Sequence, residues 1–213
     1  MLDRRRFVSR LLGLGAAVSI LGSSGVGYAA LPPAEEALIG RIEAYLDGLE
    51  NLEARFTQIG PDGQLATGTF YLSRPGKLRI DYDPPSKLLL LATDWRLIFY
   101  DGSIQQVTTI PLAQTPLGFL LAEKIRLEGE VTVRELRRNA GEIAVTVARS
   151  DAPDQGSVTL VFAEQPLELR RWTVIDPQGL ATRVILEDMR TDVAFDPALF
   201  HWRDPRIFGF PED

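Results

Sequence analysis

Residues 68–82 read GTFYLSRPGKLRIDY, and this stretch predicts two short antiparallel strands joined by a tight turn. Apolar side chains recur at every second position on both sides of the turn, the pattern of strands with one buried face. At the turn, Pro75 fixes one backbone dihedral and Gly76 supplies a turn conformation. Beside it stands Arg74, a permanently charged group. Since an isolated hairpin is marginally stable in water, the apolar face of this one must belong to a larger sheet.

The rest of the chain repeats these signals in both directions. Alternating segments are separated by turn sequences such as Asp101-Gly102 and the DPQG at 176–179. We count about ten or eleven short strands, at intervals typical of an antiparallel sandwich or barrel. Before the first strand, apolar residues between 35 and 49 recur at helical spacing, which predicts a helix with one inward stripe. The sequence thus predicts one mainly β domain with a few helices.

A second helical segment interrupts the strands at residues 111–123. Thr115 is a suitable N-cap and Pro116 a suitable first residue, and apolar residues then surround barely two turns of helix. Such a helix is not stable when exposed, so it must cover another apolar surface. Both an ordinary helix over the core and a plug over a cavity meet this requirement.

The first 29 residues are typical of an export signal. Arginines at residues 4–6 precede an apolar run that glycines dilute, and small residues follow at 27–29. The run is short for a membrane span, although an N-terminal anchor is the alternative. We therefore predict a signal peptide of the twin-arginine type at 1–29, with a plain secretory route as its alternative, and a single exported domain at 30–213.

Composition argues against several classes of function. The chain contains no cysteine and a single histidine, His201, so a disulfide framework is excluded and we expect no metal centre and no cofactor. Without the signal peptide, 19 basic residues face 28 acidic ones, a net charge of −9 that argues against nucleic-acid binding.

The sequence contains no catalytic motif that would indicate an enzyme. The sequence has neither the Gly-x-Ser-x-Gly turn of hydrolases nor a phosphate-binding glycine loop. Asp81 and Asp83 share one face of a strand and could form an acid–base pair, but solubility at a strand end explains them more simply. We therefore predict no catalytic residues.

Three groups of residues occur in an order that characterises one protein family. They are ARFTQ at 54–58, the hairpin at 68–82, and the Tyr100-Asp101 strand with QQVT at 105–108. In this ordered set the chain resembles the LolA family of periplasmic lipoprotein carriers, from about residue 35 to residue 208. No single motif carries the resemblance.

The resemblance implies an unclosed antiparallel β-barrel of about eleven strands with a lid of short α-helices. The family's cavity holds the acyl chains of lipoproteins, which arrive from an inner-membrane ABC transporter of the LolCDE type and leave to a LolB-like outer-membrane acceptor. A periplasmic monomer is therefore expected. Arg74 matches the arginine that locks the family's lid by hydrogen bonds, although a solvated turn arginine is the alternative. The implied lid-helix residues are Leu117, Phe119, Leu120 and Leu121.

From the strand period we expect a set of inward-facing side chains that would line such a cavity. They are Phe56, Phe70, Leu72, Leu78, Ile80, Leu89, Leu91, Leu97 and Phe99. This set offers no polar group, which an enzyme on this fold would require. Leu78 and Ile80 stand where better-known relatives carry aromatics, and the lid segment is shorter, so ligand retention and handover could differ. The alternative function is a domain of this fold that binds another lipid or senses mislocalised lipoproteins.

Overall fold

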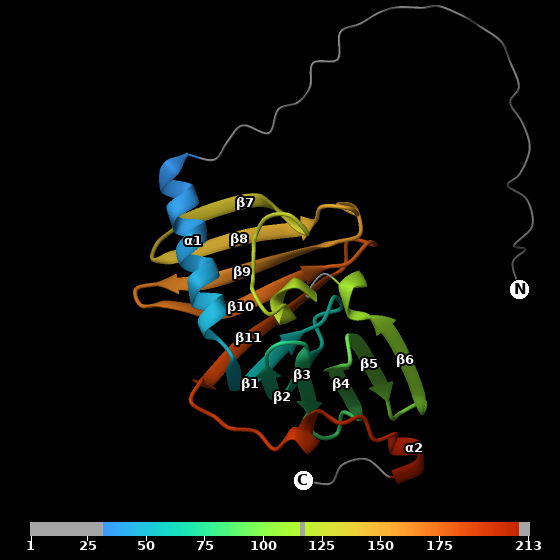
Figure 1. The fold of residues 1–213 in the computed structure, drawn as a ribbon. Coiled ribbons are helices and arrows are strands. Elements are labelled where there is room, and N and C mark those ends of the chain that lie inside the picture. The colour runs from blue at the N-terminus through green and yellow to red at the C-terminus, as the bar shows by residue number, and fades with distance from the viewer. Residues whose placement is uncertain (1–31, 116–117, 209–213) are drawn as a thin grey trace, which may run out of the picture. The chain divides into compact units, whose positions relative to one another are not determined.

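The structure is a computed structural model that describes residues 32–115 and 118–208 (Figure 1). The predicted signal peptide lies outside the described residues. Within them, no helix has the length and apolar character needed to cross a membrane. The helical elements are α1 (Pro33–Gly48), the 3-10 helices η1 (Leu112–Gln114), η2 (Gly118–Leu121) and η3 (Pro197–Phe200), and α2 (Pro205–Phe208). The strands are β1 (Asn51–Ile59), β2 (Leu65–Ser73), β3 (Lys77–Tyr82), β4 (Leu88–Thr93), β5 (Arg96–Asp101), β6 (Gln106–Pro111), β7 (Val131–Asn139), β8 (Glu142–Arg149), β9 (Ser157–Glu164), β10 (Leu167–Ile175) and β11 (Ala181–Arg190).

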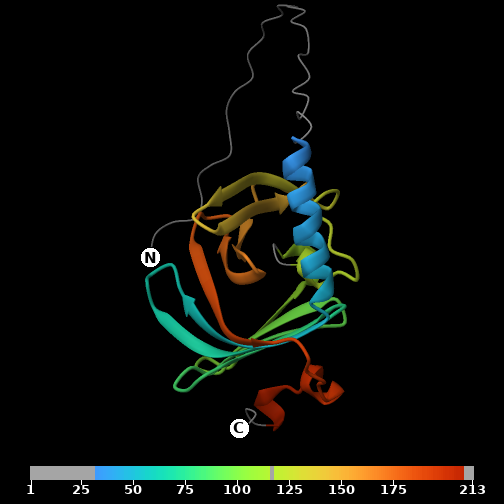
Figure 2. The same ribbon diagram turned by 90° about the vertical axis from the view of Figure 1, so that its left-hand side faces the viewer.

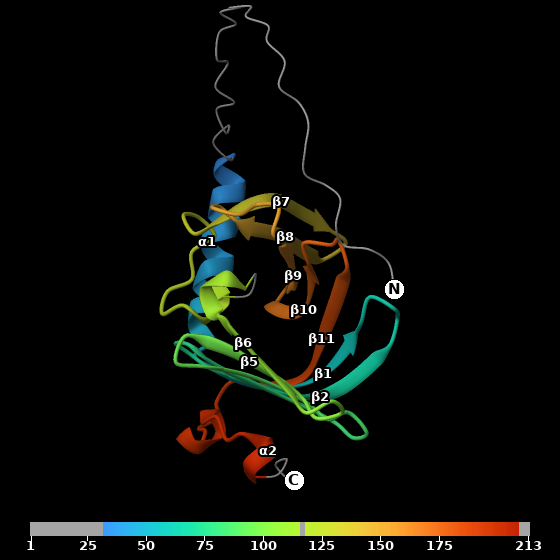
Figure 3. The ribbon, with the colours of Figure 1, turned by 90° about the vertical axis from the view of Figure 1, so that its right-hand side faces the viewer.

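The eleven strands of the described residues form a single sheet in the order β6-β5-β4-β3-β2-β1-β11-β10-β9-β8-β7. Consecutive strands pair antiparallel within β1–β6 and within β7–β11, and at the centre of the sheet β1 also pairs antiparallel with β11. The sheet curls so that β1–β6 and β7–β10 form two walls, with β11 running between them (Figures 2 and 3). No pairing joins β6 to β7 in the described part of the chain, so the barrel is unclosed. The predicted unclosed antiparallel barrel of about eleven strands is confirmed.

The inner face of the curl carries the main hydrophobic core. Leu52 of β1 lies directly opposite Leu72 of β2, and both side chains are buried. α1 lies beside η2 on one side of the curled sheet (Figures 2 and 3) and buries Ile42 and Leu46. These two residues are four positions apart, the spacing that puts side chains on one helix face. The helix thus packs its apolar stripe onto the inside of the sheet.

The outer face of β3–β5 has an apolar cover of its own, formed by the C-terminal segment with η3 (Figures 1 and 3). Leu89 and Leu91 point to this side, because it is Leu90 that pairs opposite the inward Ile80. Both leucines are buried there, together with Phe200 of η3. The prediction that Leu89 and Leu91 face a cavity is therefore wrong. β4 is buried on both faces and apolar at nearly every position, so its sequence could not indicate which side faces inward.

Candidate functional site

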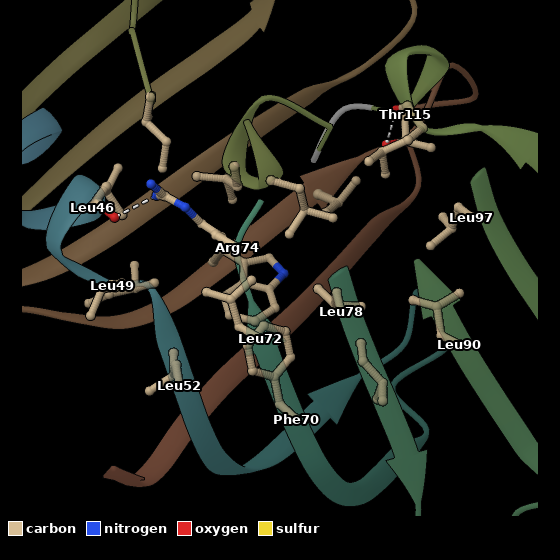
Figure 4. Close-up of a pocket in the computed structure, with 18 of the residues that line it drawn as sticks. Leu46, Leu49, Leu52, Phe70, Leu72, Arg74, Leu78, Leu90, Leu97 and Thr115 are labelled. Carbon is tan, nitrogen blue, oxygen red and sulfur yellow. Dashed lines mark hydrogen bonds between the residues drawn. The ribbon is translucent and has the colours of Figure 1, made fainter. Parts of the chain in front are cut away.

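An apolar cavity of about 300 Å³ lies inside the curl, between the β1–β6 wall and the elements that cover it (Figure 4). Apart from Arg74, Gln114 and Thr115, every side chain that lines it is apolar. The apolar lining consists of Leu46, Leu49, Leu52, Phe70, Leu72, Leu78, Ile80, Leu90, Leu97, Ile110, Leu112, Leu120, Leu121, Ile125, Leu169, Trp172 and Val174. A pocket of this kind offers little beyond dispersion and desolvation, which suits the alkyl part of a ligand.

The structure brings together five of the nine side chains predicted to line a cavity. These are Phe70, Leu72, Leu78, Ile80 and Leu97. Phe56 shares their face but packs instead on Tyr82, with ring centroids 5.3 Å apart in an edge-to-face contact. Phe99 is on the same face and 36% exposed, outside the lining. Leu89 and Leu91 lie on the opposite face, as described above.

Several lining residues were not predicted. Leu46 and Leu49 come from the end of α1, whose apolar stripe was recognised as inward without a link to the cavity. Trp172 comes from β10 in the other wall and packs on Phe70, with ring centroids 5.5 Å apart. The sequence contrast between Trp172 and the charged Arg171 before it could have indicated that Trp172 is buried. No pattern within one strand, however, indicates which strand lies across the curl.

We call residues 112–115 and 118–127 the lid segment. Leu120 and Leu121 of η2 line the cavity, whereas Phe119 is buried on the other side, against a separate, more polar hollow. The predicted lid residue Leu117 lies outside the described residues. Where an α-helix of nearly two turns was expected, the described residues form two short 3-10 helices, η1 and η2. The Thr115 hydroxyl donates to the carbonyl of Leu112 at 2.8 Å, and the Thr115 carbonyl accepts from the Gly118 amide at 3.1 Å.

Gly118 is the point of closest approach within the lid segment. A Cβ atom at this position would lie 2.4 Å from the carbonyl oxygen of Leu112, far inside van der Waals contact. Only glycine lets η2 fold back this tightly on η1.

The β2–β3 hairpin holds the lid segment through its turn. The amide of Gly76, with a φ of 77°, donates to the carbonyl of Leu121 at 2.8 Å. Next to it, the Arg74 side chain is only 4% exposed and runs along the cavity wall (Figure 4). The tip of β2–β3 therefore contacts the lid segment by main chain, through Gly76, and by side chain, through Arg74.

Arg74 joins the two covering elements to each other. Its Nη1 donates to the carbonyl of Leu46 in the last turn of α1 at 2.7 Å, and its Nη2 donates to the carbonyl of Glu123 at 3.3 Å. Nη2 also lies 3.5 Å from the carboxylate of Asp47. The C-terminal end of a helix attracts a cation because its last carbonyls are unpaired. We call these contacts of Arg74 the latch.

Two carboxylates of α1 complete the attachment of the lid segment. Asp47 accepts hydrogen bonds from the Ile125 amide at 2.7 Å and from Arg126 at 3.3 Å, and Glu43 accepts one from the Leu127 amide at 2.7 Å. Burial acts to raise the pKa of Asp47, but the Ile125 amide and the guanidinium groups of Arg126 and Arg74 outweigh it and hold this pKa below its usual value. Asp47 is therefore a carboxylate stabilised in its charged form.

Asp81 at the end of β3 and Asp83 just after it each bind other partners. Asp81 binds Arg79 at 2.8 Å, and Asp83 forms an ion pair with Arg55 while accepting a hydrogen bond from Thr67. These hydrogen bonds lower the pKa of Asp83 in spite of some burial. Both carboxylates thus serve ion pairs at the strand surface, and the described residues contain no group of three or more acidic or histidine side chains that could hold a metal ion.

The chain is similar in sequence to known proteins over most of its length. A sequence model described as "Outer membrane lipoprotein carrier protein LolA" matches residues 47–203. An outer-membrane lipoprotein carrier protein of Methylococcus capsulatus is 30% identical over 189 residues, covering 84% of this chain and 90% of the relative. One from Azotobacter vinelandii is 28% identical over 198 residues, covering 87% and 94%. A solved LolA superfamily structure from Nitrosomonas europaea has a TM-score of 0.45 at 11% identity, covering 77% of this chain and 97% of that one. Since the family model matches most of its length, the chain belongs to the LolA family.

Proposed function

We propose that this protein is a periplasmic carrier that holds the acyl chains of lipoproteins in the cavity beneath the lid segment. The observation that carries the proposal is the cavity itself: it is apolar, and it is covered in part by a short segment that Arg74 and the carboxylates of α1 hold in place. Relatives over most of the chain are outer-membrane lipoprotein carrier proteins. The residues we assign to the acyl chain are those of the cavity lining, with Leu120 and Leu121 as the lid contacts.

The cavity answers a solvation problem. An acyl chain of about fifteen methylenes costs on the order of 12 kcal/mol to leave in water, at about 0.8 kcal/mol for each methylene. A lipoprotein therefore does not cross an aqueous compartment unaided, and a carrier must offer it a dry apolar surface. The cavity volume of about 300 Å³ is at the small end of the range of ligand pockets. Entry of more than one chain requires the lid segment to move.

The latch has a strength that suits a reversible lid. A hydrogen bond to a charged group contributes about 1.5–3 kcal/mol, and the two bonds of Arg74 go to the end of α1 and to the lid segment. Together the two bonds favour the closed state, yet their contribution is smaller than the free energy gained when one acyl chain leaves water. An acyl chain that can enter only when the lid segment is displaced therefore gains more free energy from burial than the latch opposes, and its binding opens the lid.

The route of the cargo follows from this role. Residues 1–29 would direct export, and the exported protein would receive lipoproteins from an inner-membrane ABC transporter of the LolCDE type. It would then deliver them to the outer membrane, through a LolB-like acceptor where one exists. This role requires no cofactor, and a single copy of the chain is sufficient for it.

A release assay tests the proposal. Spheroplasts that retain a labelled outer-membrane lipoprotein are mixed with the purified exported protein, and lipoprotein in the supernatant is measured. We expect the wild type to release the lipoprotein as a soluble complex, and Arg74→Leu to change its uptake or its onward transfer. Arg171→Leu is the matched control, since Arg171 also makes two side-chain hydrogen bonds, to Glu142, but lies outside the cavity. Failure of the wild type to release lipoprotein while it binds a free lipid would contradict the carrier role.

A further inference from the structure

The sheet of the described residues ends in two free edges, β6 and β7, and they differ in how they are protected. A free edge presents unpaired main-chain groups, and proteins usually block it with charged side chains or a bulge. β7 has a bulge between Val133 and Glu135. It also carries four charged residues, Arg134, Glu135, Arg137 and Arg138. β6 reads QVTTIP, without a charge, and pairs with β5 without a break in register (Figure 1). The edge at β6 is therefore the one open to a further strand.

The hydrogen bonding of β6 determines which of its main-chain groups point away from β5. The amide of Leu112, just after β6, donates to the carbonyl of Trp95 at 2.9 Å, so these two residues form a hydrogen-bonded pair. Such pairs alternate with non-hydrogen-bonded pairs along an antiparallel ladder. Val107 and Thr109 therefore turn their N–H and C=O groups away from β5, and Pro111, which lacks an N–H, turns its carbonyl the same way. β6 thus offers two donors and three acceptors to a further strand.

The free edge borders the cavity. Ile110 of β6 lines the cavity, and so does Leu97, which pairs with it from β5. Ile110 is nevertheless 40% exposed, and Phe99 on the same inner face is 36% exposed. These two side chains form an apolar strip beside the edge that the described residues leave partly uncovered. Alternate side chains of a further strand would pack next to Ile110 on this inner face.

The polypeptide of an acylated cargo is in the right place to supply that strand. Its main chain is joined to the alkyl chain at one residue, so an alkyl chain in the cavity brings the first residues of the cargo to the cavity rim. A strand advances about 3.4 Å per residue, so four residues span the edge from Ile110 to Val107. Such a strand begins at the cavity and runs against the direction of β6. Main-chain hydrogen bonds of this kind do not depend on the sequence of the bound segment, which suits a carrier of different cargoes.

We propose that the free edge of β6 binds the extended polypeptide segment that follows the acylated residue of the cargo, as an added strand antiparallel to β6. This inference rests on the proposed function and adds to it a site for the polypeptide part of the cargo. The uncharged edge, the outward main-chain groups of Val107 and Thr109, and the position of Ile110 in the cavity lining together carry it.

The first test compares three acylated peptides. Each is an N-dodecanoyl hexapeptide amide of alternating serine and threonine: one is unmodified, one is N-methylated at its second and fourth residues, and one at its third and fifth. Affinity for the exported protein is measured by displacement of a fluorescent apolar dye. In an added strand every second amide faces its neighbour, so one methylated peptide should bind at least about tenfold more weakly than the unmodified peptide, and the other about equally well. Equal affinities of the two methylated peptides would overturn the inference.

The second test changes the edge itself. Thr109→Pro removes one outward N–H and leaves the hydrogen bonds to β5 in place, so we expect the unmodified peptide to bind about fivefold more weakly. Methyl dodecanoate has an acyl chain but no polypeptide, and its affinity should not change. Thr109→Ala is the matched control, because it keeps the N–H and should bind both probes like the wild type. Thermal unfolding verifies that each variant is folded. An equal loss of peptide affinity in both variants would contradict recognition by the main chain.

The outcomes separate this inference from the proposed function. If methyl dodecanoate binds and peptide affinity depends neither on N-methylation nor on Thr109→Pro, the inference fails while the apolar cavity keeps its assignment. If neither methyl dodecanoate nor any peptide binds the wild type, the inference and the assignment of the cavity both fail. Sedimentation of the ligand-free protein tests a second copy of the chain as the occupant. A dimer that Thr109→Pro dissociates would assign the edge to that copy and overturn the inference.

Discussion

At the residue scale, the attachment of the lid segment depends on a few polar atoms grouped around Arg74 and Asp47. Arg74 binds main-chain oxygens of Leu46 and Glu123, which no side-chain substitution can remove. Asp47 binds the main-chain amide of Ile125. In each of these hydrogen bonds one partner is a side chain and the other is a main-chain group. Substitutions of Arg74 and Asp47 are therefore the informative ones.

Asp47 should give this attachment a dependence on pH. Its folded-state pKa is lowered, so its contribution to stability is complete above the unfolded-state pKa of about 4 and is lost as the pH falls through the lower, folded-state pKa. We expect Asp47→Asn to reduce the free energy of unfolding by about 1 kcal/mol at pH 7, and the difference from wild type to shrink below pH 4. Urea unfolding of both proteins between pH 3 and pH 7 measures it. A difference that does not vary with pH would contradict this role.

Gly118 offers a second test of the lid segment. In Gly118→Ala the new methyl group would overlap the carbonyl oxygen of Leu112, so η2 must shift, and we expect a loss of about 1–3 kcal/mol in the free energy of unfolding. Binding of an apolar dye should change with it. Gly40→Ala is the control: Gly40 lies in α1 with open space around it, and alanine there should be neutral or stabilising by up to about 1 kcal/mol. Equal effects of the two substitutions would count against a tight turn in the lid segment.

At the element scale, β4 separates two apolar cores. Its inner side contributes Leu90 to the cavity, and its outer side contributes Leu89 and Leu91 to the layer beneath η3. One strand therefore serves two surfaces, with the cavity lining on one face and attachment of the C-terminal segment on the other.

Substitutions on the two faces of β4 should have different effects. Leu91→Ala removes a fully buried side chain, so we expect it to lower the free energy of unfolding by about 2–5 kcal/mol and to leave the binding of methyl dodecanoate unchanged in the folded protein. Leu90→Ala should enlarge the cavity, alter the affinity for the ester, and cost less stability. The free energy of unfolding is measured by denaturant unfolding, and the affinity for methyl dodecanoate by its displacement of a fluorescent apolar dye. A change of ligand affinity in Leu91→Ala alone would show that the two faces are assigned the wrong way round.

The elements also show how far the sequence could lead. Turn signals such as Asp101-Gly102 and the alternation in 68–82 are local, so the number of strands could be predicted. The two-sided burial of β4 depends on a segment about a hundred residues later in the chain, which no pattern in β4 reveals. The partners of Arg74 are backbone atoms 28 and 49 positions away, and such acceptors leave no trace in residue types. The family resemblance gave the expected role of Arg74; periodicity alone could not.

At the scale of the whole molecule, the two walls share one core. Buried residues of β1–β4 and of β8–β11 belong to the same apolar cluster, together with α1 and η2. The central pairing of β1 with β11 makes the sheet continuous across the walls. Neither wall has a complete core without the other.

This continuity predicts a single unfolding transition. The chain has three tryptophans, of which Trp95 lies next to β5 in one wall and Trp172 in β10 of the other. Variants that retain only Trp95 or only Trp172 should report the same urea midpoint by fluorescence, equal to the midpoint from circular dichroism. Transitions that separate by more than the effect of the substitutions themselves would show that the walls unfold independently.

The pairing of β1 with β11 also bears on the order in which the chain is delivered. β1 gains β2 as a neighbour once residues up to 73 have emerged, but its other edge waits for Ala181–Arg190, close to the end of the chain. Until then, a row of unpaired main-chain groups borders an apolar face that has only one wall. A polypeptide that emerges from its N-terminus thus spends most of its synthesis or translocation as a template for unwanted strand pairing. The sheet is therefore complete only after β11 has emerged, and until then protection of the nascent chain against such pairing must come from another molecule.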